Sequence, residues 1–207
     1  MTATQTRVLT QALEVDPRLS ELKVERRKLL NVRDTALAAA ADATGFHAAN
    51  AAGTFSYHYG TFAMRNELVG EVWRQDRPNG VEAVSNDALR LRLVFANVDV
   101  ACDLFHYPKP RSEKGAGAQR MSSGNLFGFL PGFATSASVD RDGWTVYFIM
   151  VDEKGAMELT CAAISGGKFS NFVERLFISD GSDIGRGPEI LTDDLPAVEF
   201  DPQVARK

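Results

Sequence analysis

The chain has 207 residues, of which 44% are hydrophobic and 24% are charged, and its formal net charge is −4 at pH 7. This composition is that of an ordinary globular protein, and the negative charge argues against a surface that binds nucleic acid or acidic membranes over its whole extent. The N-terminus lacks the basic start and apolar block of a signal peptide, and no apolar run approaches the ~20 residues of a membrane span, so we expect a cytoplasmic protein.

Three regions follow from the distribution of polar residues along the chain. Residues 1–17 are polar, which predicts a flexible N-terminus. Residues 18–179 contain the periodic apolar patterns of a single α+β domain. Residues 180–207 hold seven acidic and three basic side chains together with three prolines, which predicts an acidic, turn-rich C-terminal tail.

The segment that begins at Arg18 predicts a long N-terminal helix. Leucines recur at helical spacing among charged neighbours, an alanine-rich stretch follows, and Gly45 is the first glycine of the chain. We therefore expect one helix of about 25 residues. A helix that packs on the domain is the first interpretation, and a dimerising coiled coil is the alternative.

Residues 54–62 alternate aromatic and polar side chains, which predicts a strand. Within it, His58 stands between Tyr57 and Tyr59. A histidine beside tyrosines can stack on a ligand or act as a general base, so these three residues are candidate binding residues. A hydrogen-bonded structural histidine is the alternative interpretation. The following residues, 62–75, fit a helix or a strand.

Two alternating apolar patterns, at residues 89–95 and 98–104, change phase where they meet. One regular strand cannot change phase without turning its faces over, so we expect a hairpin or a strand with a bulge. In the hairpin, arginines of the first segment would form cross-strand ion pairs with aspartates of the second. These residues are Arg90, Arg92, Asp99 and Asp103.

A clearer hairpin is predicted at residues 143–164, where two apolar runs are joined by the sequence DEKG. The first run is apolar on both faces, which places it at the centre of a sheet. The apolar spacing of residues 169–177 then predicts a second helix. Together these elements predict an α+β fold in which a long N-terminal helix and a second helix pack on a mainly antiparallel sheet.

The segment 106–125, HYPKPRSEKGAGAQRMSSGN, carries four basic side chains and one acidic one. It lacks the third glycine of a dinucleotide fingerprint and the Gly-Lys-Ser/Thr of a P-loop. Loops of this length without structure are uncommon unless they are functional or disordered, so it is either a mobile solvated loop or one that orders on a partner. Its candidate binding residues are Lys109, Arg111, Lys114, Gly115, Gly117 and Arg120.

No catalytic signature accompanies these residues. Asp99, Asp103 and His106 have side chains that bind metals, but strand alternation would turn His106 away from the two aspartates. A His-Glu-x-x-His motif and a nucleophile elbow are also missing from the sequence. We therefore predict no catalytic residues, no metal site and no cofactor.

The sequence leaves three functions open. The first is a cytoplasmic binding or regulatory protein that uses the basic loop to contact a protein partner or a second copy of the chain, without a membrane. The second is a metal- or histidine-dependent enzyme that acts on a phosphorylated substrate or nucleic acid through His58 and the Asp99/Asp103 pair. The third is a nucleic-acid-binding module in which tyrosines stack on bases and the loop holds phosphates.

Overall fold

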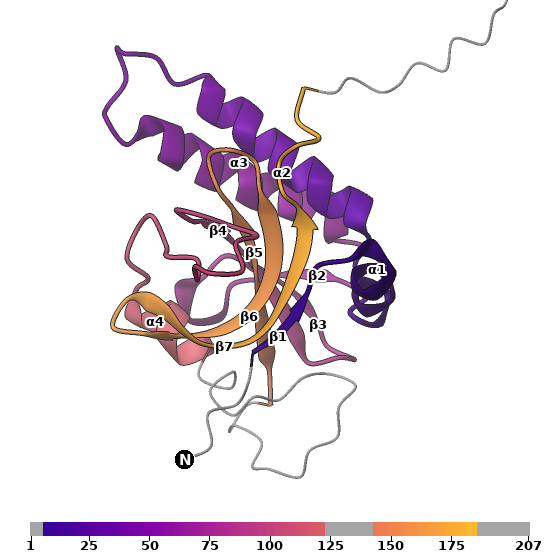
Figure 1. Ribbon diagram of the computed structural model, residues 1–207. Coiled ribbons are helices and arrows are strands. Elements are labelled where there is room, and N and C mark those ends of the chain that lie inside the picture. The colour runs from indigo at the N-terminus through magenta and orange to yellow at the C-terminus, as the bar shows by residue number, and fades with distance from the viewer. Residues whose placement is uncertain (1–5, 123–142, 186–207) are drawn as a thin grey trace, which may run out of the picture.

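The computed structural model describes residues 6–122 and 143–185, which form a mixed seven-stranded sheet and four α-helices (Figure 1). The strand order is β1-β7-β6-β5-β4-β3-β2, in which the pairs β1/β7 and β4/β5 are parallel. The expectation of a mainly antiparallel sheet with a long N-terminal helix is therefore wrong. The strands are β1 (Arg7–Leu9), β2 (Arg74–Asp76), β3 (Ala83–Asn86), β4 (Leu91–Asn97), β5 (Thr145–Val151), β6 (Met157–Ser165) and β7 (Lys168–Ser179).

The phase change near Asn97 marks the end of β4, not a hairpin turn. The chain leaves the sheet there and returns as the parallel strand β5, because parallel neighbours need a long crossover between them. The ion pairs predicted within the supposed hairpin are wrong as well. Arg92 lies 3.4 Å from Asp76 of β2, and the guanidinium of Arg90 lies over the ring of Trp144.

The predicted long helix is divided into α1 (Ala12–Glu21) and α2 (Arg26–Ala41). Lys23 between them has a φ of 58°, in the left-handed region that ends a helix. Leu22 and Val24 on either side are buried in the core, and the indole N–H of Trp73 donates to the Lys23 carbonyl over 2.9 Å. Burial of this short connection against the sheet therefore outweighs the helical propensity of the sequence.

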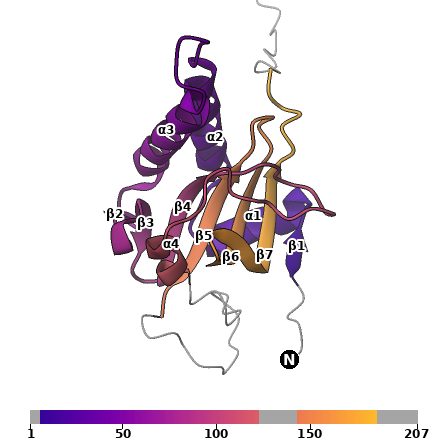
Figure 2. The ribbon, with the colours of Figure 1, turned by 90° about the vertical axis from the view of Figure 1, so that its left-hand side faces the viewer.

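Helix α3 (Ala51–Leu68) occupies the segment that was predicted to begin with a strand. It packs beside α2 (Figure 2). A Cβ atom at Gly60 would lie 2.4 Å from the ring of Phe95 on β4. The helix therefore approaches the sheet more closely than a residue with a side chain would permit. The alternation of aromatic residues reflects their places around this helix, not the two faces of a strand.

The residues predicted to form the second helix belong instead to a strand, β7. Its register against β6 shifts in mid-strand: Ser170 pairs with Ala163, whereas Glu174 pairs with Cys161. Strand β7 thus spans four residues where β6 spans two. This β-bulge changes the apolar phase in mid-strand. The sequence FSNFVERLFI consequently has the spacing of a helical face although the chain is extended.

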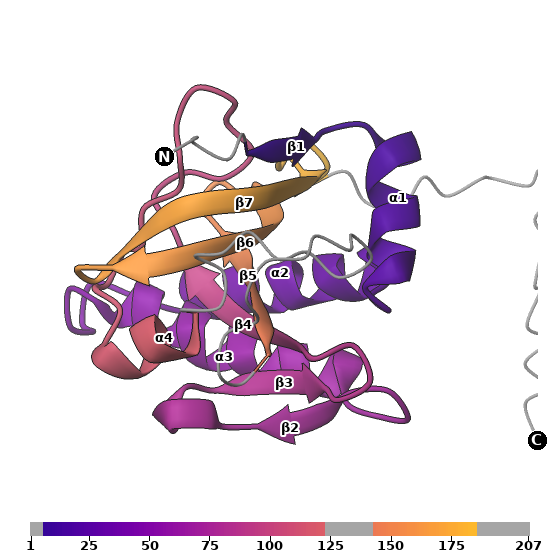
Figure 3. The ribbon, with the colours of Figure 1, turned by 90° about the horizontal axis from the view of Figure 1, so that it is seen from below.

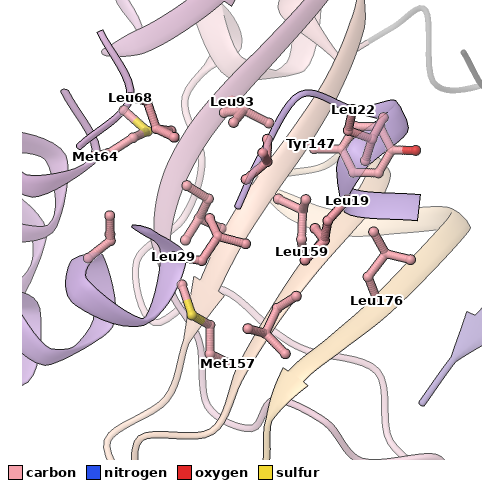
Figure 4. Close-up of a cluster of buried hydrophobic side chains, with 14 of the residues drawn as sticks. Leu19, Leu22, Leu29, Met64, Leu68, Leu93, Tyr147, Met157, Leu159 and Leu176 are labelled. Carbon is pink, nitrogen blue, oxygen red and sulfur yellow. The ribbon is translucent and has the colours of Figure 1, made fainter. Parts of the chain in front are cut away.

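Both faces of the sheet are covered, and each has its own hydrophobic cluster. Helices α1, α2 and α3 cover one face, where the labelled leucines and methionines of Figure 4 meet. On the other face, helix α4 (Ala116–Met121) contributes Ala118 and Met121 to the second cluster. In Figure 3, α2 and α3 lie behind the strands and α4 lies in front.

The hairpin predicted at residues 143–164 is confirmed as β5 and β6, and β5 is buried along its whole length. Strand β1 and the first part of α1 lie within residues 1–17, and the division of the chain into three regions stays a prediction. Among the described residues, no helix has the length and apolar character to cross a bilayer.

Candidate functional site

A solvent-open pocket of about 590 Å³ lies beside the first half of β7. It is lined by Thr6, residues 107–109 and residues 168–172, three segments that are far apart in the sequence. Strand β1 pairs only with residues 174–176 of β7, so the pocket lies just beyond the end of that pairing. We call it the aromatic–lysine pocket, after Tyr107, Phe169, Phe172, Lys109 and Lys168.

Ring stacking and two polar contacts join the three segments. The ring of Tyr107 stacks on Phe172 with the centroids 4.5 Å apart and the planes at 25°. The Thr6 hydroxyl donates to the Phe172 carbonyl over 2.8 Å and lies 3.3 Å from the Tyr107 hydroxyl. Such an aromatic pair contributes about 0.5–1.5 kcal/mol of stabilisation in addition to that from its buried apolar surface. This wall of the pocket is therefore preformed.

The β-bulge of β7 positions two of the residues that line the pocket. Asn171 has a φ of 46°, and with Phe172 it lies in the bulge, between the paired residues Ser170 and Glu174. Bulges turn side chains away from the directions that a regular strand imposes. The bulge therefore places Asn171 and Phe172 in the pocket lining.

Two aspartates fix the chain that carries Tyr107 and Lys109. Asp99 accepts the N–H of Lys109 over 2.7 Å, and its own N–H donates to the Lys109 carbonyl over 3.0 Å. Asp103 accepts the N–H groups of Phe105 and His106, and the Phe105 contact is the first cause of its lowered pKa. The aspartates that were candidates for a metal site are thus engaged in turns.

This turn is attached to the sheet by a buried ion pair. Arg175 donates to the Asp103 carbonyl over 2.8 Å and to both carboxylate oxygens of Glu158. The N–H of Cys102 also donates to Glu158, over 2.8 Å. Because Arg175 and Glu158 are almost completely buried, their geometry fixes the position of residues 102–107 over the sheet.

The pocket has an excess of positive charge. Lys109 and Lys168 form no ion pair with any residue in the described parts of the chain, and none of the nine lining residues is acidic. An anion that entered this pocket would meet two ammonium groups and three aromatic rings without a competing carboxylate among the lining residues. The arrangement suits an anionic group attached to an apolar or flat one.

Between residues 106 and 122 the basic segment contacts the sheet at Lys114 and through α4, while Lys109, Arg111 and Glu113 are exposed. The choice between a mobile solvated loop and one that orders on a partner stays a prediction. The Lys114 N–H donates to the Gly167 carbonyl over 2.9 Å, and α4 follows with two side chains in the core. A Cβ atom at Gly117 would lie 2.3 Å from the Asn79 carbonyl oxygen, so this glycine permits close packing of α4. Residues 123–125 lie outside the described residues.

The candidate residues chosen from the sequence are separated. Lys109 lines the pocket and Lys114 lies beside it, whereas Arg111 is paired with Glu153 at 2.6 Å. Gly115 is the N-cap residue that precedes α4, and Arg120 is exposed on α4. The other three candidates, Tyr57, His58 and Tyr59, lie on α3 over the opposite face of the sheet. Tyr57 and Tyr59 therefore do not share a surface with the basic segment, whereas Tyr107 lies beside Lys109 in the pocket.

Sequence reasoning missed Lys168, Phe169 and Phe172. Their segment was assigned to a helix packed on the sheet, which concealed the lysine at the start of a strand. The available signal was the turn Gly166-Gly167 before Lys168, because two glycines after an apolar strand favour a tight hairpin.

The described residues contain no cluster of three side chains suited to hold a metal ion. Comparisons of the chain with protein-family models, with curated proteins and with solved structures found no match.

Proposed function

We propose that this is a non-catalytic cytoplasmic binding protein that recognises an acidic segment of a protein partner at the aromatic–lysine pocket. The observation that carries the proposal is the pair Lys109 and Lys168, which face the pocket without an ion-pair partner among the described residues. This retains the binding surface expected in the basic segment and extends it to β7.

The surroundings of the pocket favour a protein partner over a small free anion. Leu104 and Phe105, close to Tyr107 in the chain, are 63% and 90% exposed, and the Asp103 turn holds them in place. A small ion would leave these apolar side chains without a role. Interfaces between proteins commonly combine exposed aromatic anchors with charged groups that orient the partner.

Fluorescent hexapeptides in which Glu and Phe alternate test this proposal by fluorescence anisotropy. We expect the wild-type protein to bind them and the double variant Lys109→Glu/Lys168→Glu to lose at least about tenfold in affinity, or about 1.4 kcal/mol. Added salt weakens binding because it screens exposed charges. The matched control is Arg111→Glu, which reverses a nearby charge that Glu153 already neutralises, and it should lose much less affinity.

Equal losses in the two variants would contradict recognition at the pocket, because they would show that net charge alone controls binding. A single-stranded oligonucleotide that binds more tightly than the acidic peptides would favour a nucleic-acid-binding module instead. Light scattering after size exclusion would reveal self-association as the alternative use of this surface.

A further inference from the structure

The amine of Lys114 lies next to the aromatic–lysine pocket but is not part of its lining. Its Nζ atom is 5.9 Å from the ring centroid of Phe169, a residue whose side chain also lines the pocket. The backbone of Lys114 is fixed by its hydrogen bond to Gly167, in the turn between β6 and β7. The amine is thus held partly buried against an aromatic ring.

The amine has no counter-ion among the described residues. Within residues 6–122 and 143–185 it forms no ion pair and no hydrogen bond, and the neighbouring Glu113 has its side chain against Gly167. Burial lowers the pKa of Lys114 to about 8. At neutral pH about a tenth of this amine is therefore uncharged, compared with less than about a thousandth for an ordinary lysine.

We propose that Lys114 is a reactive amine that condenses with small aldehydes to form an imine. The lone pair of Nζ attacks the carbonyl carbon, and the electrons of the C=O π bond move to oxygen. Nζ then loses its two protons, which leave with the carbonyl oxygen as water, and a C=N bond remains. No oxidant or reductant is needed, and an uncharged lysine beside apolar side chains is the type of amine that performs this chemistry.

This inference goes beyond the binding proposal and does not depend on it. An aldehyde without a negative charge needs no contact with Lys109 or Lys168, so failure of acidic peptides to bind leaves the reactivity of Lys114 unaffected. Conversely, an unreactive Lys114 leaves anion recognition by the two pocket lysines intact.

The test uses pyridoxal, an aldehyde without a phosphate group, as the probe. The full-length protein is incubated with a limiting amount at pH 7.4, the imines are trapped with borohydride, and each lysine is followed by peptide mass spectrometry. We expect Lys114 to be labelled at least about tenfold faster than the exposed Lys168, because a far larger share of its amine is uncharged. In urea the difference should disappear, since all lysines then have ordinary pKa values.

Two variants keep the result interpretable. Lys114→Arg should remove the fast-labelled site, and Lys168→Arg should leave labelling of Lys114 unchanged. Labelling of Lys114 at the rate of the exposed lysines in the folded wild-type protein would overturn the proposal. The same conclusion would follow if the fast site persisted in the Lys114→Arg variant.

Discussion

The two halves of β7 differ in whether their charged side chains are buried in ion pairs. In the second half, Glu174 and Arg175 are consecutive, point to opposite faces of the sheet and are both buried in ion pairs. In the first half, Lys168 faces an open pocket without an ion-pair partner among the described residues. The difference follows the strand's surroundings. Where β1 and the helices cover the strand, charges must be paired, and where that cover ends, a cation can remain available.

The buried half gives the largest expected effect. Glu174 accepts hydrogen bonds from Arg18, Arg7 and the Tyr147 hydroxyl, and its side chain is fully buried. Glu174→Gln leaves the buried guanidinium of Arg18 without its full counter-charge, so we expect a loss of about 3–5 kcal/mol in the free energy of unfolding. Denaturant titration at pH 7 measures this loss.

The control for this prediction is Arg111→Ala, which removes an ion pair with exposed Glu153. Exposed pairs contribute up to about 1 kcal/mol, so this variant should unfold close to the wild type. If Glu174→Gln were as mild as the control, the pairing of charges in the covered half would not be the source of its stability.

The next effect concerns the packing of α4 beside the open half. Gly117→Ala places a methyl group against the Asn79 carbonyl, and we expect a loss of about 1–3 kcal/mol from this overpacking. Gly115→Ala is the matched change, because nothing lies within 4 Å of its Cβ position, and it should cost less than about 1 kcal/mol. Thermal unfolding compares them, and equal midpoints would show that α4 is not packed as described.

The smallest effect lies just beyond the end of β7 and depends on pH. Asp183 receives hydrogen bonds from the buried guanidinium of Arg33, and these lower the pKa of its carboxyl. A lowered carboxyl pKa stabilises the fold above the unfolded value of about 3.9, and this contribution is lost as pH falls below it. Asp183→Asn should therefore cost about 1 kcal/mol at pH 7, because solvent screens this partly exposed pair.

The same variant should differ less from the wild type at pH 3, because the unfolded wild-type chain then binds a proton at Asp183 that the folded chain does not bind, and this favours unfolding. Urea unfolding at both pH values measures the two differences. A difference that stayed constant between pH 7 and pH 3 would contradict the stabilising charge of Asp183.

Sequence patterns predicted those elements that neighbouring residues in the chain determine. The turn sequence DEKG and two apolar runs were sufficient for the β5–β6 hairpin. The pairing of β1 with β7 could not be predicted from the sequence. Strand β1 has only three residues, and its partners are far away in the chain, since Arg7 lies opposite Glu174. No local periodicity reports such a contact. The division between α1 and α2 was missed for a related reason, since burial against the sheet determines the conformation at Lys23.

The candidate site was half predicted. Its charge was visible in the segment 106–125, and Lys109 and Lys114 were among the residues named. Its aromatic wall was hidden by the bulge, which gave β7 the apolar spacing of a helix. Recognition of a bulge needs the partner strand, because the extra residues are defined by the register between two strands and not by the sequence of one.

The bulge has a further consequence for the behaviour of the protein at high concentration. An exposed strand edge offers evenly spaced N–H and C=O groups to which another chain can add as an extra strand. Asn171 in its left-handed conformation interrupts that spacing in the part of β7 beyond β1, and the Thr6 hydroxyl already occupies the Phe172 carbonyl. The irregularity that shapes the pocket thus also hinders a strand of another molecule from pairing with this edge.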